Sequence, residues 1–172
     1  MRTFAAALFA SVAVASINVS ELEQILQGIV VGALDEAVPS FGDCFADAEK
    51  MIGDVEDAVK DFKKGSFSSI KSGIYAVGDA VGDFGTTLQT CESSVQDAEK
   101  LVDMASKFSN PWSYVFHIGK DILLNGVDIY GYVTAATTAW DSGDYYTFGV
   151  NVGEALDAVF IGETNGPACF TQ

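Results

Sequence analysis

The chain has 172 residues, of which 49% are hydrophobic, and a formal net charge of −15 at pH 7. Its nine basic residues include one arginine, Arg2, and are outnumbered by 24 acidic residues. A chain so acidic and so poor in arginine lacks the groups that bind phosphate, which argues against nucleic acid and anionic membrane surfaces as partners. The charge fits a solvated surface, association with cations, or a basic partner. The length fits one domain.

Residues 1–15 have the pattern of a secretory signal peptide. Arg2 supplies the positive start, residues 4–14 form an apolar core, and residues 13–15 read Ala-Val-Ala, a small-residue cleavage site. We therefore predict a protein that is secreted or lies within the secretory-vacuolar system, with a single helical domain over 16–172. No later apolar run reaches the roughly 18 residues of a membrane helix, so we expect no stable membrane span.

The first predicted helix begins at Ser20, which forms a capping box with Glu23 and precedes apolar residues at helical spacing. Pro39 is expected to end this helix, because the residue before a proline avoids the helical conformation. The tripeptide Asn-Val-Ser at 18–20 makes Asn18 a candidate site for glycosylation.

Two apolar seams with an average step of about 3.5 residues follow and predict an antiparallel helical hairpin. The turn between them reads Lys-Lys-Gly-Ser, in which Gly65 suits a left-handed helix end and Ser66 caps the next helix. The seams consist of Phe41, Phe45, Ala48, Ile52, Val55, Val59 and Phe62, then Phe67, Ile70, Ile74, Val77, Val81, Phe84 and Leu88.

A second hairpin resembles the first at an offset of 78 residues. The order aromatic, two polar residues, glycine, cap residue, aromatic occurs at 62–67 and again at 140–145. A further helix is expected over 93–107, and 162–172 has the composition of an irregular tail. The sequence thus predicts an all-α fold, a compact bundle of five to seven helices built from two diverged antiparallel helical hairpins.

Three predicted helices contain two glycines four residues apart. Glycine inside a helix costs roughly 1 kcal/mol relative to alanine, so we expect a packing reason, namely the close approach of two helix backbones. A latent membrane-inserting form is the alternative, but acidic residues such as Asp79 and Glu154 interrupt the apolar runs. The pairs are Gly28 and Gly32, Gly78 and Gly82, and Gly149 and Gly153.

Several motifs are shared with a known group of proteins. They are Asn-Gly-Val-Asp-Ile-Tyr at 125–130, Gly-Asp-Tyr-Tyr-Thr-Phe-Gly at 143–149 and Val-Gly-Glu-Ala-Leu at 152–156, with Gln-Gly at 27–28 and Asp-Cys-Phe-Ala-Asp at 43–47. With these motifs the chain resembles an uncharacterised family of small secreted all-helical proteins found in ciliates and other protists. The resemblance covers nearly the whole chain after the signal peptide and implies no activity.

The strongest candidate for chemistry is a polar stripe of His117, Asp121, Asn125 and Asp128, spaced four, four and three residues apart. Histidine and aspartate at this spacing can share a divalent metal, but a site needs a third ligand from elsewhere. The solvated face of an amphipathic helix is the simpler explanation. The sequence contains no recognisable Ser-His-Asp arrangement, phosphate-binding glycine loop or paired cysteine spacing. We therefore expect no catalytic residue, metal or cofactor.

Three functions remain in view. We expect a secreted binding or interaction module for an unknown protein or a small apolar ligand held among the C-terminal aromatic residues. The alternatives are a structural or coat-associated protein without a ligand, and a small metal-dependent hydrolase around His117, Asp121 and Asp128. Core packing is the simplest role of the aromatic side chains. These are Trp112, Phe116, Tyr130, Tyr132, Trp140, Tyr145 and Phe148.

The chain has three cysteines, so in an oxidising compartment one of them lacks a partner within the monomer. Across the predicted hairpin Cys44 lies level with Leu88, about 4.5 Å along the axis from Cys91. Side-chain reach can absorb this offset, since bridged Cα atoms lie about 4.4–6.8 Å apart. We therefore predict a disulfide between Cys44 and Cys91, worth about 4 kcal/mol in the loop-entropy account, with Cys169 unpaired within the monomer.

Overall fold

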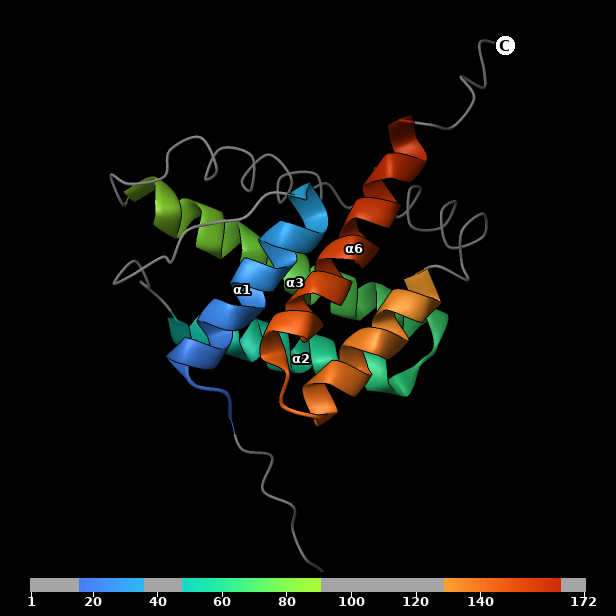
Figure 1. The fold of residues 1–172 in the computed structure, drawn as a ribbon, viewed down its shortest axis with the longest axis horizontal. Helices are drawn as coiled ribbons and strands as arrows, with labels where there is room; N and C mark the ends of the chain where they lie inside the picture. The colour runs from blue at the N-terminus through green and yellow to red at the C-terminus, as the bar shows by residue number, and fades with distance from the viewer. Residues whose placement is uncertain (1–15, 36–47, 91–128, 165–172) are drawn as a thin grey trace, which may run out of the picture.

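The computed structural model describes residues 16–35, 48–90 and 129–164. They form α1 (Val19–Leu34), α2 (Ala48–Lys64), α3 (Phe67–Thr90), a helix over 129–141 and α6 (Tyr145–Thr164), shown in Figure 1. No strand occurs in these three stretches, and the predicted all-α bundle is confirmed. The signal peptide predicted at 1–15 and the helix expected over 93–107 lie outside the described residues.

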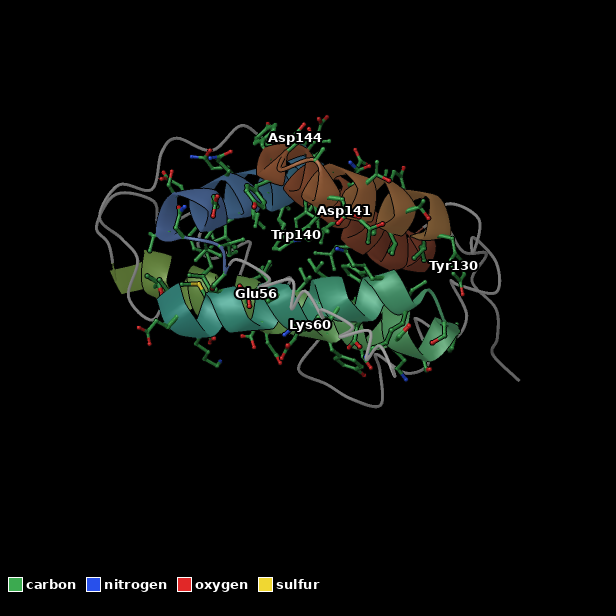
Figure 2. The ribbon with its side chains drawn as sticks, turned by 90° about the horizontal axis from the view of Figure 1, so that it is seen from below. Glu56, Lys60, Tyr130, Trp140, Asp141 and Asp144 are labelled. Carbon is green, nitrogen blue, oxygen red and sulfur yellow. The ribbon has the colours of Figure 1, made fainter. Side chains whose placement is uncertain are left out.

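The helices form two layers with the apolar core between them (Figure 2). One layer is the α2–α3 hairpin, and the other consists of α1, the 129–141 helix and α6. The predicted α3 seam is buried from Ile70 to Phe84, whereas its first residue, Phe67, is 43% exposed. In α2 the predicted seam, with its step of about 3.5 residues, included Ile52, which is only half-buried, and left out Met51, which is buried. The stripe that faces the core follows instead the 3.6-residue period of a straight helix.

The two turns inside the hairpins have the same backbone geometry. Gly65 and Gly143 both have positive φ, 66° and 76°, a conformation that favours glycine. The N–H of Gly65 donates to the carbonyl oxygen of Phe62, and that of Gly143 to the carbonyl oxygen of Trp140, each at 3.0 Å. Because these pairs are 78 residues apart, the structure confirms the two diverged hairpins that the sequence predicts.

An ion pair joins equivalent positions of the two hairpins. Lys63 Nζ lies 2.6 Å from Asp141 Oδ1, and the two residues are 78 positions apart. The helix caps also correspond, since Ser66 and Asp144 each accept a hydrogen bond from the backbone N–H three residues on, at 3.2 and 3.0 Å. The two hairpins therefore contact each other next to their turns, at equivalent positions.

α1 packs on α6 through glycines. A Cβ atom added to Gly28, Gly32, Gly149 or Gly153 would lie only 2.1–2.4 Å from a carbonyl oxygen of the facing helix. The two backbones are therefore in direct contact, and for these two pairs the predicted close approach inside the bundle is confirmed. Among the described residues, no helix combines the length and the apolar character needed to span a membrane.

The start of α1 corrects the predicted cap. The N-cap is Asn18 rather than Ser20, and its side chain accepts a hydrogen bond from the backbone N–H of Glu21 at 3.1 Å. The Glu21 carboxylate accepts in return from the N–H of Asn18 at 2.7 Å, which completes a capping box without Glu23. The capping box therefore lies two residues earlier than expected, because Asn18 and Glu21 satisfy the same cap requirement.

Two helix ends also differ from the prediction. α1 ends at Leu34 with Asp35 in the left-handed conformation at φ 52°, so the helix stops before Pro39 can act on it. Aspartate tolerates this conformation better than most residues. α6 continues to Thr164, three residues into the tail that was expected from Gly162.

Candidate binding groove

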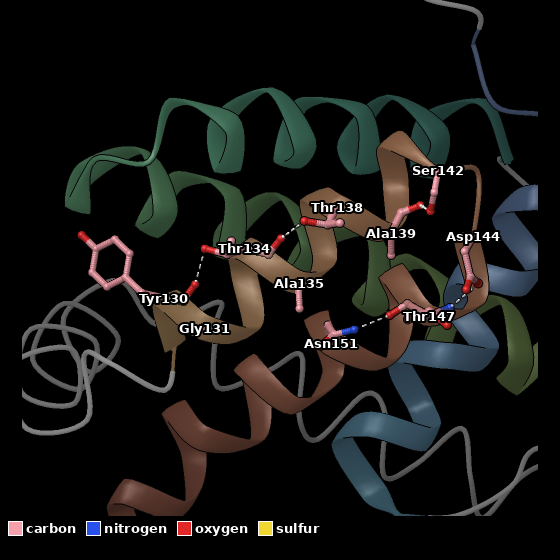
Figure 3. A pocket seen from close by; sticks show the side chains of 10 residues that line it. All are labelled: Tyr130, Gly131, Thr134, Ala135, Thr138, Ala139, Ser142, Asp144, Thr147 and Asn151. Carbon is pink, nitrogen blue, oxygen red and sulfur yellow. Dashed lines mark hydrogen bonds between the residues drawn. The ribbon is translucent and has the colours of Figure 1, made fainter.

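An open groove of about 700 Å³ lies between the 129–141 helix and the first half of α6 (Figure 3). Tyr130 stands at one end and Asp144 at the other. Glycine, alanine, serine and threonine make up most of the lining between them. The lining residues are Tyr130, Gly131, Thr134, Ala135, Thr138, Ala139, Ser142, Asp144, Thr147 and Asn151.

The two hairpins differ at a position that lines the groove. In the first hairpin Gly73 lies directly against α2, where an added Cβ would be 2.5 Å from the Phe62 ring and 3.0 Å from the carbonyl oxygen of Ala58. The equivalent residue of α6, 78 positions on, is Asn151. Its side chain lines the groove.

The N-terminal turn of α6 supplies the charged end of the groove. Asp144 is the only charged residue of the lining. The backbone N–H of Thr147 donates to Asp144 Oδ1 at 3.0 Å, and this bond, together with one from the Thr147 hydroxyl, lowers the pKa of Asp144. The carboxylate is therefore ionised at neutral pH while it caps the helix. One turn further on, Asn151 Nδ2 donates to the carbonyl oxygen of Thr147 at 2.8 Å.

Hydroxyl groups line the facing helix and the turn. Thr134 donates to the carbonyl oxygen of Tyr130 at 2.7 Å, and Thr138 donates to that of Thr134 at 2.9 Å. In the turn, Ser142 donates to the carbonyl oxygen of Ala139 at 2.8 Å. Such bonds to the preceding helical turn are a common use of threonine and serine hydroxyls. These hydroxyl hydrogens therefore point into the protein's own backbone.

The aromatic residues proposed to hold an apolar ligand do not lie together: some pack in the core, and one faces the groove. Trp140 contacts Tyr145 and Phe148 edge to face, with ring centroids 5.3 and 5.1 Å apart. Phe148 is fully buried, and Trp140 points between the two layers (Figure 2). These three side chains pack on one another as part of the core. Tyr132 is half-buried, and Tyr130, 37% exposed, faces the groove.

Most other predicted site residues lie outside the described residues. They are the cysteines, the polar stripe and two aromatic residues, namely Cys44, Cys91, Cys169, His117, Asp121, Asn125, Asp128, Trp112 and Phe116. Asn18 is exposed and caps α1 through its side-chain oxygen, and its glycosylation stays a prediction. Within 16–35, 48–90 and 129–164, no group of three or more His, Cys, Asp or Glu side chains is placed to hold a metal.

Sequence reasoning did not find the groove, although a signal for it exists. The offset of 78 residues aligns Asn151 with Gly73, a change from the smallest residue to an amide at a helix–helix contact. Thr134 and Thr138, one turn apart, lie opposite the buried face of their helix. A position-by-position comparison of the two hairpins would have marked this face as the place where they differ.

The fold and the groove define a small all-helical protein of two antiparallel hairpins with a surface groove lined mainly by small residues. Over residues 7–161 the chain matches the model of the SctB-like family, described as Secreted protein B-like, and it belongs to that family. The match supports the likeness to a family of secreted proteins, and it carries nothing about ciliates or other protists. No curated protein and no solved structure matches the chain significantly.

Proposed function

We propose that the protein is a secreted binding module whose partner or ligand occupies the groove between the 129–141 helix and α6. The observation that carries the proposal is an open groove of about 700 Å³ lined by small residues. Binding sites commonly have volumes of about 300–1,000 Å³. The first hairpin shows that the same turn also permits close helix packing at Gly73, so the open arrangement is not a requirement of the fold.

The scarcity of aromatic side chains in the lining changes the kind of ligand from the one that the aromatic residues suggested. Trp140 and Phe148 are engaged with each other in the core, which leaves Tyr130 as the aromatic residue of the groove. A coat-associated role calls for an extended apolar or acidic patch. The exposed large hydrophobic residues of the described chain come from four different helices, which gives no support to an apolar patch, whereas the formal charge of −15 is compatible with an acidic one. We propose no catalytic role, because the hydrolase alternative depends on residues outside the described part.

A pair of glycine variants tests whether the groove is the binding site. Gly131 lies in the groove, and Gly53 is the equivalent residue of the first hairpin, 78 positions earlier. At both positions an added Cβ would meet nothing within 4 Å, so both substitutions are compatible with the fold. Gly131→Leu fills the groove with a side chain, whereas Gly53→Leu adds the same side chain outside it.

The readout is the set of backbone amide signals in NMR spectra of the labelled full chain. The probes are a blocked Lys-Ser-Gly-Ser-Lys peptide, its lysine-acetylated form, a Glu-Ser-Gly-Ser-Glu peptide, maltotriose and dodecanoate. At least one probe should shift the signals of the groove residues, and Gly131→Leu should abolish those shifts while Gly53→Leu preserves them. The proposal is wrong if no probe shifts the groove residues, or if both variants bind alike.

A further inference from the structure

The groove presents hydrogen-bond acceptors rather than donors. The hydroxyls of Thr134, Thr138 and Ser142 donate to carbonyl oxygens of their own segment. One N–H of Asn151 is engaged in the same way, with the backbone carbonyl oxygen of Thr147. A hydroxyl that has used its hydrogen still offers lone pairs. Apart from the Tyr130 and Thr147 hydroxyls and the second N–H of Asn151, the polar side chains of the lining can therefore only accept.

The charge of the groove favours the same kind of ligand as its hydrogen-bond acceptors do. Asp144 is the only charged group of the lining, and the whole chain carries a formal charge of −15. The N-terminus of α6 would attract an anion, but the Asp144 carboxylate already caps it. The groove therefore disfavours phosphates and carboxylates, and it favours a positively charged group rich in hydrogen-bond donors.

The two ends of the groove can each hold a cation. Asp144 offers an ionised carboxylate, and the exposed ring of Tyr130 offers a face to which ammonium and guanidinium groups are attracted. Asp144 N–H bonds the carbonyl oxygen of Ala139, which places this end nine residues along the helix from Tyr130. At 1.5 Å per residue the ends are about 13 Å apart along the helix axis. An extended peptide covers that length in about four residues.

We infer that the occupant of the groove is a basic peptide segment of a partner protein, extended and carrying two lysine or arginine residues about four positions apart. This inference rests on the proposed function, since it names the chemistry of what binds there. One cation lies on Asp144 and the other on Tyr130, and the backbone N–H groups between them donate to the threonine and serine oxygens. A free diamine shares the charge but lacks those backbone donors.

An NMR titration of the full chain with the blocked Lys-Ser-Gly-Ser-Lys peptide tests this chemistry. Two matched pairs of variants are compared. Asp144→Asn keeps an N-capping residue and removes the groove charge, whereas Asp57→Asn makes the same change in net charge on the first hairpin. Thr138→Val removes a lining acceptor, whereas Thr137→Val removes a hydroxyl that donates to the same carbonyl oxygen without lining the groove.

The lysine peptide should bind the groove, and acetylation of both lysines should weaken it at least tenfold. Asp144→Asn should weaken binding about three- to fivefold and Thr138→Val about twofold or more, with little change for either control. Cadaverine, a free diamine, should bind more weakly than the peptide. Equal binding of the acetylated peptide, maltotriose or dodecanoate at the groove would overturn the cationic assignment and leave the binding module standing. If Asp144→Asn and Asp57→Asn lose the same affinity for the lysine peptide, the loss comes from the change in net charge alone, and the inference is refuted.

Discussion

Replacing Gly149 by alanine tests directly how α1 packs on α6. The added Cβ would lie 2.1 Å from the carbonyl oxygen of Ile25 and 3.0 Å from the Cα of Gly28. Both neighbours are backbone atoms, which cannot rotate away as a side chain can. Ordinary van der Waals contact begins at about 3.4 Å, so the two helices would have to separate by roughly 1 Å to admit one methyl group.

The expected loss follows from two opposing terms. Overpacking of this kind costs about 1–3 kcal/mol, and the backbone neighbours place Gly149→Ala at the upper end of that range. Alanine is better than glycine inside a helix by about 1 kcal/mol, which offsets part of the loss. The variant should therefore be destabilised by about 2 kcal/mol. For a chain of this length that corresponds to a melting temperature lower by about 4–8 °C.

The matched control is Gly131→Ala, where an added Cβ meets nothing within 4 Å. Only the helix-propensity term acts there, so this variant should gain up to about 1 kcal/mol. Urea unfolding followed by far-UV circular dichroism measures both free energies of unfolding. The same substitution should thus have opposite signs at Gly149 and Gly131. A Gly149→Ala protein as stable as Gly131→Ala would show that α1 and α6 are not in backbone contact.

Three further predictions address other parts of the chain. Lys63→Asp should lower the free energy of unfolding by up to about 1 kcal/mol in low salt, and adding Asp141→Lys should restore most of it, which a double-mutant cycle measures. Burial raises the pKa of Asp54, whose Oδ2 is buried without a hydrogen bond, so its ionisation opposes folding as the pH rises through that pKa. Asp54→Asn should therefore stabilise the protein at pH 7 and lose this advantage below about pH 4; an equal gain at both pH values would contradict the reasoning. Peptide mapping without reductant should find Cys44 joined to Cys91, and a bridge from either to the third cysteine would disprove that pairing.

Short sequence patterns predicted the helix ends and the apolar seams, because these depend on residues that are close together in the chain. The turn glycines Gly65 and Gly143 were recognisable because a left-handed helix end strongly favours glycine. The α3 seam was recognisable because its apolar residues repeat at the helical period. The cap of α1 was misplaced for the same local reason, since Asn18 and Ser20 are both good caps and only the fold selects one.

Long-range packing was beyond the reach of these patterns. The glycine pair at Gly28 and Gly32 predicted a close helix neighbour but not that this neighbour is α6, which lies more than a hundred residues later in the chain. The groove was missed because it depends on how far apart two helices stand. Local periodicity does not report that distance, although Gly73 lies against α2 whereas Asn151, its equivalent, lines the groove.

The duplicated hairpins also show why the second of them, rather than the first, suits a partner. Thr134 and Thr138 occupy the positions that Glu56 and Lys60 hold in the first hairpin, 78 residues earlier (Figure 2). Glu56 is half-buried and accepts a hydrogen bond from the backbone N–H of Ile17, and Lys60 is exposed and pairs with Asp57. Covering the two residues further would remove full charges from water, which is expensive. Covering Thr134 and Thr138 costs far less, because their hydrogens are already bonded to the helix. The second hairpin thus lacks two charges that the first carries at equivalent positions, and a donor-rich partner can cover its face at a lower cost.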